Sequence, residues 1–319
     1  MFAESFVALA SLLTFREARM PVAQPMVTQS LPVARYIPGP RPPVKKDPNS
    51  FGIETTARAA VVMDVTSGEI LYEKNAEATY PIASLTKLVT AMTVLDQKRD
   101  MEEVITILRE DDPKEGKSVF PTGEQFTREE LLKSLLVGSV NTAGNTLARA
   151  GGGMEPFVAA MNVKVQRLGM HRTHLLEPTG LDSNNQASAH DVAIALRAAL
   201  HYPEIRDITK ISKIELIGRA TGKPYLLDST NLLLSSFLNK NPYKIVAGKT
   251  GSLPEAGYCL AQATQDKQGH EVIVVVLGSD NHFSRFQDAK ALTFWTFEQF
   301  TWPEKGSAQG YALPVAVLP

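Results

Sequence analysis

Ser84 and Lys87, in the segment PIASLTKLVTAMTVL, lie three positions apart where a helix is expected to begin. At that spacing the two side chains share one face of the helix. A serine hydroxyl is a poor nucleophile and needs an adjacent base. A lysine in a poorly solvated site can have its pKa lowered enough to serve as that base. The pair also fits a helix cap followed by a surface lysine, and by itself it favours that interpretation, because such caps are common.

Two further elements contain residues suited to the same chemistry. The segment VGSVNTAGN places Ser139 and Asn141 on a short loop between two expected helices. The triplet 249–251, Lys-Thr-Gly, follows on an expected strand. Ser-x-x-Lys, a Ser-x-Asn-type element and Lys-Thr-Gly together are the signature of penicillin-interacting serine enzymes. The three elements favour the catalytic interpretation of Ser84.

The segment VAGKTGS, residues 246–252, also ends like a P-loop. That motif requires a glycine five positions before Gly248, so that the backbone can wrap a phosphate. The chain has Tyr243 at that position, followed by Lys, Ile and Val. A β-branched run of this kind predicts a strand and excludes the nucleotide site.

With these motifs, the chain resembles the low-molecular-mass penicillin-binding proteins, which are serine-type D-Ala-D-Ala carboxypeptidases and endopeptidases. The resemblance covers about residues 55–300 and extends to LGMHRTHLLEPTGLDSNN, which is similar to the connecting segment of the endopeptidases. It implies an α/β (α+β) fold of the β-lactamase/transpeptidase-like type. In that fold an antiparallel sheet is flanked by helices and accompanied by a helical subdomain.

The resemblance also implies a role for each motif residue. Lys87 would take the proton of Ser84, which attacks the carbonyl between two D-alanines, and Ser139 would relay a proton to the leaving amine. Lys249 and Thr250 would bind the terminal carboxylate. No metal or organic cofactor is implied. The implied catalytic residues are Ser84, Lys87 and Ser139, and the implied substrate-binding residues are Asn141, Lys249, Thr250, Gly251 and Ser252, with the N–H groups of Ser84 and Ser252 forming an oxyanion hole.

The elements that position these residues follow the order strands, helices, strands, helix. ARAAVVMDVTSGEILYEKN predicts a hairpin, and KIVAG, YCLAQATQD and HEVIVVVLGSD predict later strands. FSRFQDAKALTFWTFEQF has apolar residues at helical spacing. The early strands must pair with the late ones, which predicts an antiparallel sheet with helices against it.

Local signals mark the ends of several helices in the middle of the chain. Thr127 with Glu130, and Ser188 with Asp191, are read as capping boxes. The three glycines 151–153 are expected to end the helix that starts near Asn141.

Composition separates the 319 residues into three parts. Residues 1–50 contain an apolar run, Phe6 to Phe15, and then eight prolines between Pro21 and Pro48. The run is too short to span a bilayer, and both a signal segment and an apolar helix remain open. The proline-rich part is expected to be a linker. Residues 51–302 form the expected catalytic domain, and residues 303–319 a flexible tail.

Charge and cysteine content restrict the classes of function. The net charge of −1 gives no bulk attraction to nucleic acid or anionic membrane. The single cysteine, Cys259, rules out an intramolecular disulfide and is expected to be a buried small apolar residue. His171 and His174 lack a third ligand nearby in sequence and are expected at the surface.

The expected substrate is a peptidoglycan stem peptide or cross-link, with β-lactams as inhibitors, in the periplasm or extracytoplasmic cell wall. Two alternatives remain. A serine β-lactamase would need a water-positioning glutamate, for which Glu177 is the nearby candidate without the usual sequence setting. A non-catalytic peptidoglycan-binding protein could keep the pocket, although the intact motif residues argue against it.

Overall fold

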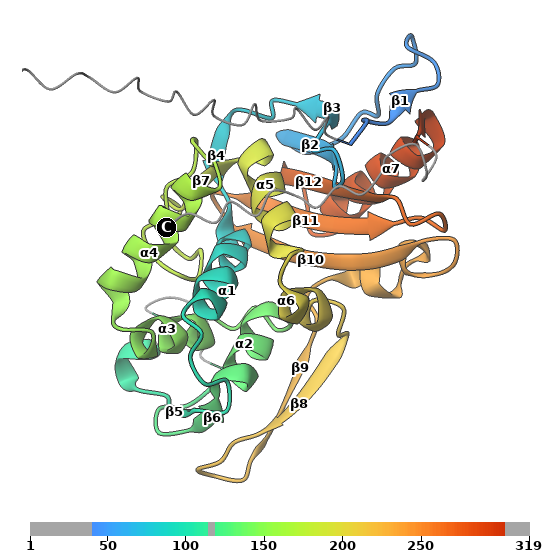
Figure 1. Cartoon of the computed structure of the whole chain (residues 1–319). Helices are drawn as coiled ribbons and strands as arrows, with labels where there is room; N and C mark the ends of the chain where they lie inside the picture. Colours follow the sequence, from blue (N-terminus) through green and yellow to red (C-terminus); the bar gives the residue numbers. More distant parts are fainter. Residues whose placement is uncertain (1–39, 114–118, 304–319) are drawn as a thin grey trace, which may run out of the picture. The chain divides into compact units, whose positions relative to one another are not determined.

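The computed structural model describes residues 40–113 and 119–303. A five-stranded antiparallel sheet in the order β10-β11-β12-β2-β3 forms its centre (Figure 1). The pairing of β2 with β12 joins the N-terminal hairpin to the C-terminal strands, which confirms the predicted sheet. These strands are β2 (Ala59–Asp64), β3 (Ile70–Lys74), β10 (Lys244–Leu253), β11 (Gly257–Gln265) and β12 (Glu271–Ser279).

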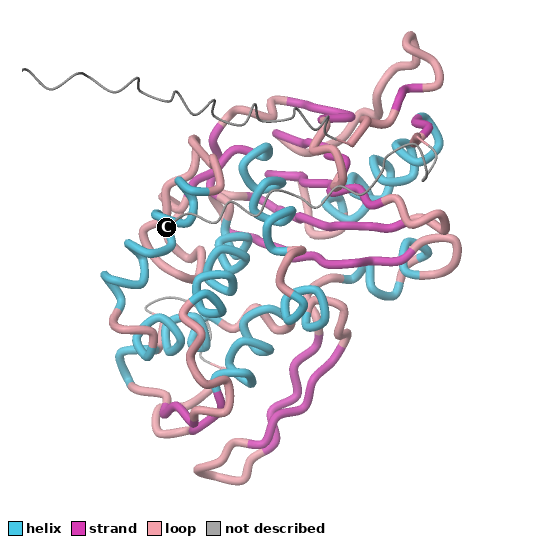
Figure 2. Tube along the Cα trace, in the orientation of Figure 1, coloured by secondary structure: helices cyan, strands magenta, loops and turns pink. Residues whose placement is uncertain are grey.

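Both faces of the sheet are covered by helices, as Figure 2 shows. Successive side chains of a strand point to opposite faces. Val274 and Val276 therefore pack in one apolar cluster with Leu292 of α7 (Ser284–Gln299). Ile273 and Val275 belong to the cluster on the other face, against which α5 (Ala189–Ala199) packs. Burial on both faces explains why β12 is an unbroken apolar run.

The remaining helices and short hairpins lie mainly between β4 and β10 in the chain (Figure 1). The strand pairs are β4 (Thr79–Pro81) with β7 (Gln186–Ser188), β5 (Val104–Thr106) with β6 (Gln125–Thr127), and β8 (Lys213–Ile217) with β9 (Pro224–Asp228). The α-helices are α1 (Lys87–Asp96), α2 (Arg128–Leu136), α3 (Asn141–Ala150), α4 (Met154–Arg167) and α6 (Pro203–Ile208). Short 3-10 helices are η1 (Ala83–Thr86), η2 (Arg109–Asp111), η3 (Leu232–Ser235) and η4 (Phe237–Asn239).

The structure confirms one of the two predicted capping boxes. Thr127 accepts the N–H of Glu130, and the Glu130 carboxylate accepts the N–H of Thr127 at 2.7 Å. Ser188 caps α5 by accepting the N–H of Asp191 at 3.0 Å. The reciprocal half of that box was wrongly predicted, because the Asp191 carboxylate instead accepts the N–H of Arg172 and the hydroxyl of Thr173. The Asp191 side chain thus forms hydrogen bonds with another segment of the chain and not with the start of its own helix.

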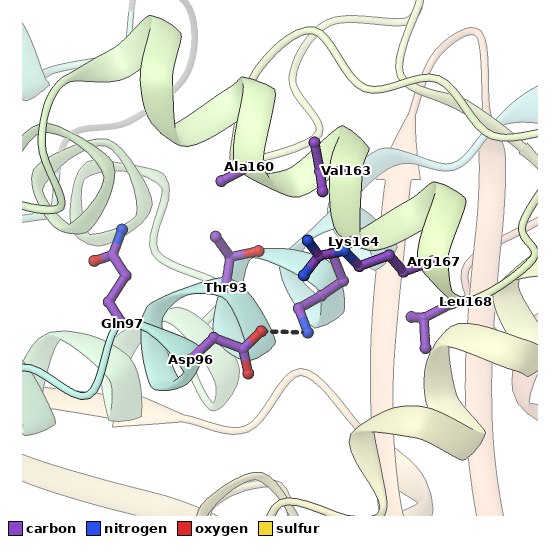
Figure 3. A pocket seen from close by; sticks show the side chains of 8 residues that line it. All are labelled: Thr93, Asp96, Gln97, Ala160, Val163, Lys164, Arg167 and Leu168. Carbon is purple, nitrogen blue, oxygen red and sulfur yellow. Dashed lines mark ion pairs between the residues drawn. The ribbon is translucent and has the colours of Figure 1, made fainter. Parts of the chain in front are cut away.

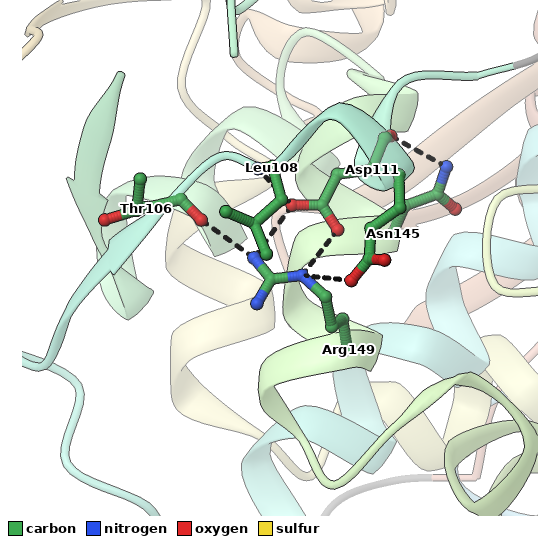
Figure 4. Close-up of polar contacts among 6 residues, drawn as sticks. Thr106, Leu108, Asp111, Asn145 and Arg149 are labelled. Atoms are coloured by element: carbon green, nitrogen blue, oxygen red, sulfur yellow. Dashed lines mark hydrogen bonds and ion pairs between the residues drawn. The ribbon is translucent and has the colours of Figure 1, made fainter. Parts of the chain in front are cut away.

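Helix α3 ends at Ala150 before the predicted glycines and is anchored near that end by Arg149 (Figure 4). The guanidinium donates to both carboxylate oxygens of Asp111, each at 2.8 Å, and to the carbonyl of Thr106. Asn145 donates to the carbonyl of Asp111 at 3.0 Å. Asp111 is buried, so this bidentate pair fixes α3 against η2 and β5.

The folded part begins earlier than residue 51. β1 (Val44–Lys45) pairs antiparallel with β13 (Phe300–Thr301), and the Lys46 N–H donates to the Gln299 carbonyl at 2.8 Å. The predicted linker therefore ends before β1. The apolar run at residues 6–15 and the tail from residue 304 lie outside the described residues. Within the described part, no helix has the length and apolar character needed to cross a bilayer.

Candidate active site

The Ser84 hydroxyl lies 2.8 Å from the Nζ of Lys87, at the junction of η1 and α1. The Lys87 amine also lies 2.7 Å from Oδ1 of Asn141, the first residue of α3. Its third neighbour is the carbonyl of Thr179, at 2.5 Å. Lys87 is completely buried, whereas Ser84 is partly exposed. The interpretation of Lys87 as a surface residue that follows a helix cap is therefore wrong.

Burial lowers the pKa of Lys87 to about 7, and the nearby Glu177 carboxylate opposes this effect. A neutral lysine has two N–H donors and one lone pair. The Asn141 oxygen and the Thr179 carbonyl can only accept, so they take the two N–H groups. The lone pair is then left for the hydroxyl proton of Ser84. With the amine neutral, the three neighbours leave its lone pair directed at the Ser84 oxygen.

A second lysine lies on β10, one of the two edge strands of the five-stranded sheet. The Nζ of Lys249 donates to Oγ of Ser139 at 2.9 Å and to the Thr250 carbonyl at 3.0 Å. Burial is the main cause that holds the pKa of Lys249 well below its usual value, and repulsion from the charges of Lys87 and Arg285 acts in the same direction. The Thr250 hydroxyl donates to the hydroxyl of Thr230 at 2.6 Å. These contacts bring the second and third motifs together beside the first.

Two residues of the site have a left-handed backbone. Ser139 has φ of +57°, and Ala83, directly before Ser84, has φ of +47°. This region is unfavourable for residues with a Cβ and occurs mainly where the surroundings impose it, often at functional sites. Ser84 follows the first of these residues within the short helix η1, and Ser139 is the second, so both hydroxyls come from short segments outside the α-helices.

Two glycines allow the backbone to approach Ser84 closely. A Cβ at Gly251 would lie 2.8 Å from the Ile82 carbonyl and 3.1 Å from the Ser84 nitrogen. A Cβ at Gly180, whose φ is +82°, would lie 1.9 Å from the Ala83 carbonyl. Gly251 therefore lets β10 pack against η1, and Gly180 lets the segment after Glu177 support η1.

The Glu177 carboxylate is occupied by contacts within its own loop. One oxygen accepts the N–H and the hydroxyl of Thr179 at 2.7 and 2.6 Å. The other accepts the N–H of Gly180 and the side-chain amide of Asn185. Asn185 in turn donates to Thr86 Oγ1 at 3.2 Å, within η1. Glu177 holds this loop against η1, and its acceptor sites are filled by protein donors.

Arg285 of α7 is a site residue that the sequence motifs did not identify. Its buried guanidinium donates to the Gly251 carbonyl at 3.0 Å, and its charge is one cause of the lowered pKa of Lys249. Thr230, which contacts Thr250, was also missed. Neither residue belongs to a local sequence pattern, and each contacts the site from another part of the chain. Among the site residues that the motifs missed, Gly180 lies in the segment PTGLD, which belongs to the stretch noted above as similar to the endopeptidases.

Other candidate features lie away from these residues. A hollow of about 380 Å³ between α1 and α4 contains the ion pair of Asp96 with Lys164 at 2.5 Å (Figure 3). Asp96 ends α1, so at 1.5 Å per residue it lies about 13 Å along the helix from Lys87. In the described residues no group of three His, Cys, Asp or Glu is arranged to hold a metal. Cys259 is buried, as predicted, and burial raises the pKa of its thiol to about 11.

A serine in contact with a buried lysine, beside an edge strand with a second lysine, defines a serine hydrolase that works through an acyl-enzyme. The sequence model of the D-alanyl-D-alanine carboxypeptidase family, peptidase family S11, matches residues 44–281, and the chain belongs to this family. It is accordingly a serine-type DD-peptidase of the low-molecular-mass penicillin-binding class.

Individual relatives agree with this assignment. The chain is 34% identical over 270 residues to the D-alanyl-D-alanine endopeptidase of Pseudomonas aeruginosa, covering 83% of this chain and 84% of that protein. It is 29% identical over 262 residues to the Escherichia coli D-alanyl-D-alanine endopeptidase, covering 81% and 83%. A Streptomyces DD-transpeptidase structure superposes with a TM-score of 0.72 at 26% identity, covering 78% of this chain and all of that one. The predicted fold class is confirmed.

Proposed function

We propose that Ser84 is the nucleophile and Lys87 its general base in the cleavage of D-Ala-D-Ala bonds of peptidoglycan stem peptides or cross-links. The observation that carries this assignment is the 2.8 Å contact between the hydroxyl and a buried amine whose pKa is about 7. Such a base is about half neutral at pH 7, where an ordinary lysine is almost fully protonated. Attack on the carbonyl gives the acyl-enzyme and releases the amine of the leaving residue.

As the C–N bond breaks, Ser139 relays to the leaving nitrogen the proton that Lys87 took from Ser84, and the contact of Ser139 with Lys249 supports that role. Lys249 and Thr250 bind the carboxylate of the terminal residue. In the free enzyme the pKa of Lys249 is low. A bound substrate carboxylate raises this pKa and so favours the protonated lysine, because an opposite charge nearby stabilises the charged form. The N–H groups of Ser84 and Ser252 serve as oxyanion donors, and the close approach of Gly251 to η1 supports this pairing.

Hydrolysis of the peptide acyl-enzyme does not require Glu177 as a base. Class A β-lactamases use a glutamate to position the water for deacylation. The Glu177 carboxylate instead accepts four hydrogen bonds from its own loop, from Thr179, Gly180 and Asn185. This favours a DD-peptidase, for which penicillin is a slowly released inhibitor, over a β-lactamase.

We further assign the catalytic domain to residues 51–302, to which β1 adds a short strand. Since β1 belongs to the folded part, the expected N-terminal segment of residues 1–50 is shortened, and residues 1–43 and 303–319 are assigned as connecting segments. Because the substrate is cell-wall peptide, the site of action is extracytoplasmic, and we propose the periplasm. Neither nucleic acid nor an integral membrane span enters this function.

The test follows a penicillin and a peptide ending in D-Ala-D-Ala with the same enzyme preparation. Mass spectrometry should find a penicilloyl adduct on Ser84 that persists for minutes or longer, while the peptide is consumed over many turnovers. The tethered leaving group of penicillin obstructs water, whereas D-alanine diffuses away. Rapid, repeated hydrolysis of penicillin without peptide cleavage would favour the β-lactamase. Absence of both reactions would favour a non-catalytic binding protein.

A further inference from the structure

The loop segment 177–180 runs along the start of α1, and its backbone is bonded to that helix at two successive residues. The carbonyl of Pro178 accepts the hydroxyl of Thr90 at 2.6 Å. The carbonyl of Thr179 accepts the Nζ of Lys87 at 2.5 Å. Lys87 and Thr90 lie three positions apart, so their side chains share one face of α1. The position of the carbonyl at the lysine therefore depends on how this loop segment is held.

The carboxylate of Glu177 fixes the residue whose carbonyl meets Lys87. Its Oε2 accepts both the N–H and the hydroxyl of Thr179, at 2.7 and 2.6 Å. Its Oε1 accepts the N–H of Gly180 and the side-chain amide of Asn185. Thr179 and Asn185 are completely buried, so loss of these acceptor oxygens would leave buried donors without partners. Glu177 thus fixes the loop segment at the point where it contacts the lysine.

The elements that meet at Lys87 contribute groups of different charge. The loop contributes the Glu177 carboxylate, which raises the pKa of Lys87 against the effect of burial. Strand β10 contributes the buried amine of Lys249, whose own pKa is well below its usual value. Helix α3 contributes the neutral amide of Asn141, and η1 contributes the hydroxyl of Ser84. Among these neighbours, the Glu177 carboxylate is the group that can stabilise a positive charge on the lysine.

We propose that Glu177 is a positioning residue for acylation. Its carboxylate holds the Thr179 carbonyl against Lys87 and places a negative charge near the lysine. In acylation the Ser84 oxygen bonds to the substrate carbonyl carbon while its proton moves to Nζ of Lys87, so a positive charge appears in a buried site. An opposite charge nearby favours the charged form of a lysine. The inference rests on the proposed function and adds a residue that acts through Lys87 and Thr179.

The test is the pH profile for acylation of Ser84 by a fluorescent penicillin in the wild type and two variants of Glu177. Glu177→Gln keeps the length of the side chain and one acceptor oxygen, and it removes the charge. The pKa of Lys87 should then fall, because no carboxylate opposes the effect of burial. Since the rate follows the neutral fraction, the ratio of the rate at pH 5 to the rate at pH 8 should rise about threefold or more. The rate at pH 8 itself should fall about tenfold, because the lysine becomes a weaker base.

Glu177→Asp separates the charge from the geometry. Aspartate keeps the charge but is one methylene shorter, so it holds Thr179 less well. The ratio of the rates at pH 5 and pH 8 should stay near that of the wild type, while both rates fall. A purely structural role would instead lower the rates of both variants equally at every pH, and that result would overturn the proposal. A Glu177→Asp rate equal to the wild-type rate would also overturn the positioning role, and this comparison does not need the glutamine variant to fold.

The matched control is Asp182→Asn, which removes a carboxylate from the same loop. The Asp182 carboxylate accepts the N–H and the side-chain amide of Asn184, at 2.8 and 2.9 Å, and its loss should change neither the rate nor the ratio. A change in this control as large as in Glu177→Gln would overturn the assignment to Glu177. The ratio does not depend on the fraction of active enzyme, so partial unfolding cannot produce the shift.

Failure of this inference is distinguishable from failure of the proposed function. If the wild-type rate rises through pH 7 and Glu177→Gln shows the same ratio, only the role of Glu177 is overturned. If the wild type shows no rise near pH 7, or no penicillin adduct on Ser84, the proposed function is overturned together with the inference.

Discussion

The pH dependence of acylation tests the assignment of Lys87 directly. Burial lowers its pKa from 10.5 to about 7. With the ordinary value, about one molecule in 3,000 would carry the neutral amine at pH 7, against about half with the lowered value. Burial therefore raises the population of competent base by about a thousandfold or more. Since the base acts in its unprotonated form, activity is lost as pH falls through about 7.

The assay is the rate of acylation of Ser84 by a fluorescent penicillin at constant ionic strength. The neutral fraction of Lys87 is about 1% at pH 5 and about 90% at pH 8. The rate should therefore rise roughly 90-fold between them where residue 249 keeps its charge, as in Lys249→Arg, and by less in the wild type. Loss of the charge on Lys249 should lower the rate at higher pH. In Lys249→Arg the guanidinium stays protonated, so this variant should keep the rising limb and lose the falling one. A rate that is constant from pH 5 to 8, or that rises toward pH 10 without a bend near 7, would refute the role of Lys87.

Three further predictions concern single changes to the chain. Ser84→Ala should abolish the covalent penicillin adduct in mass spectrometry while the melting temperature stays near that of the wild type; an adduct on the variant would show that another residue is the nucleophile. Lys249→Ala should slow acylation about tenfold or more, since a hydrogen bond to a charged group contributes roughly 1.5–3 kcal/mol, and arginine should restore part of the rate; equal stopped-flow kinetics for alanine variant and wild type would exclude carboxylate binding. Deleting residues 1–48 removes β1 and should lower the calorimetric melting temperature by about 2–4 °C without loss of penicillin labelling. Deleting residues 1–43 keeps β1 and should leave the melting temperature unchanged. Identical melting temperatures for the two truncated proteins would mean that β1 adds no stability.

Much of the fold could be predicted because its signals are local or periodic. The hairpin of β2 and β3, the apolar run of β12 and the cap at Thr127 each depend on a few neighbouring residues. The pairing of β2 with β12 followed from the order of strands and helices. The cap at Ser188 was only half right, because Asp191 bonds Arg172 and Thr173 instead of its own helix start. A local pattern shows which hydrogen bonds a side chain could form, and the tertiary structure determines which of them it does form.

The sequence by itself determined the types of catalytic residue, the spacing of Ser84 and Lys87, and the family to which they point. Tertiary structure decided the surroundings that make those residues reactive. The lowered pKa of Lys87 arises from burial among segments that lie 54 and 92 residues away, at Asn141 and Thr179. Arg285 reaches Gly251 across 34 residues, from a helix with no motif. Desolvation and charge repulsion depend on distance in space, and spacing along the chain does not encode that distance.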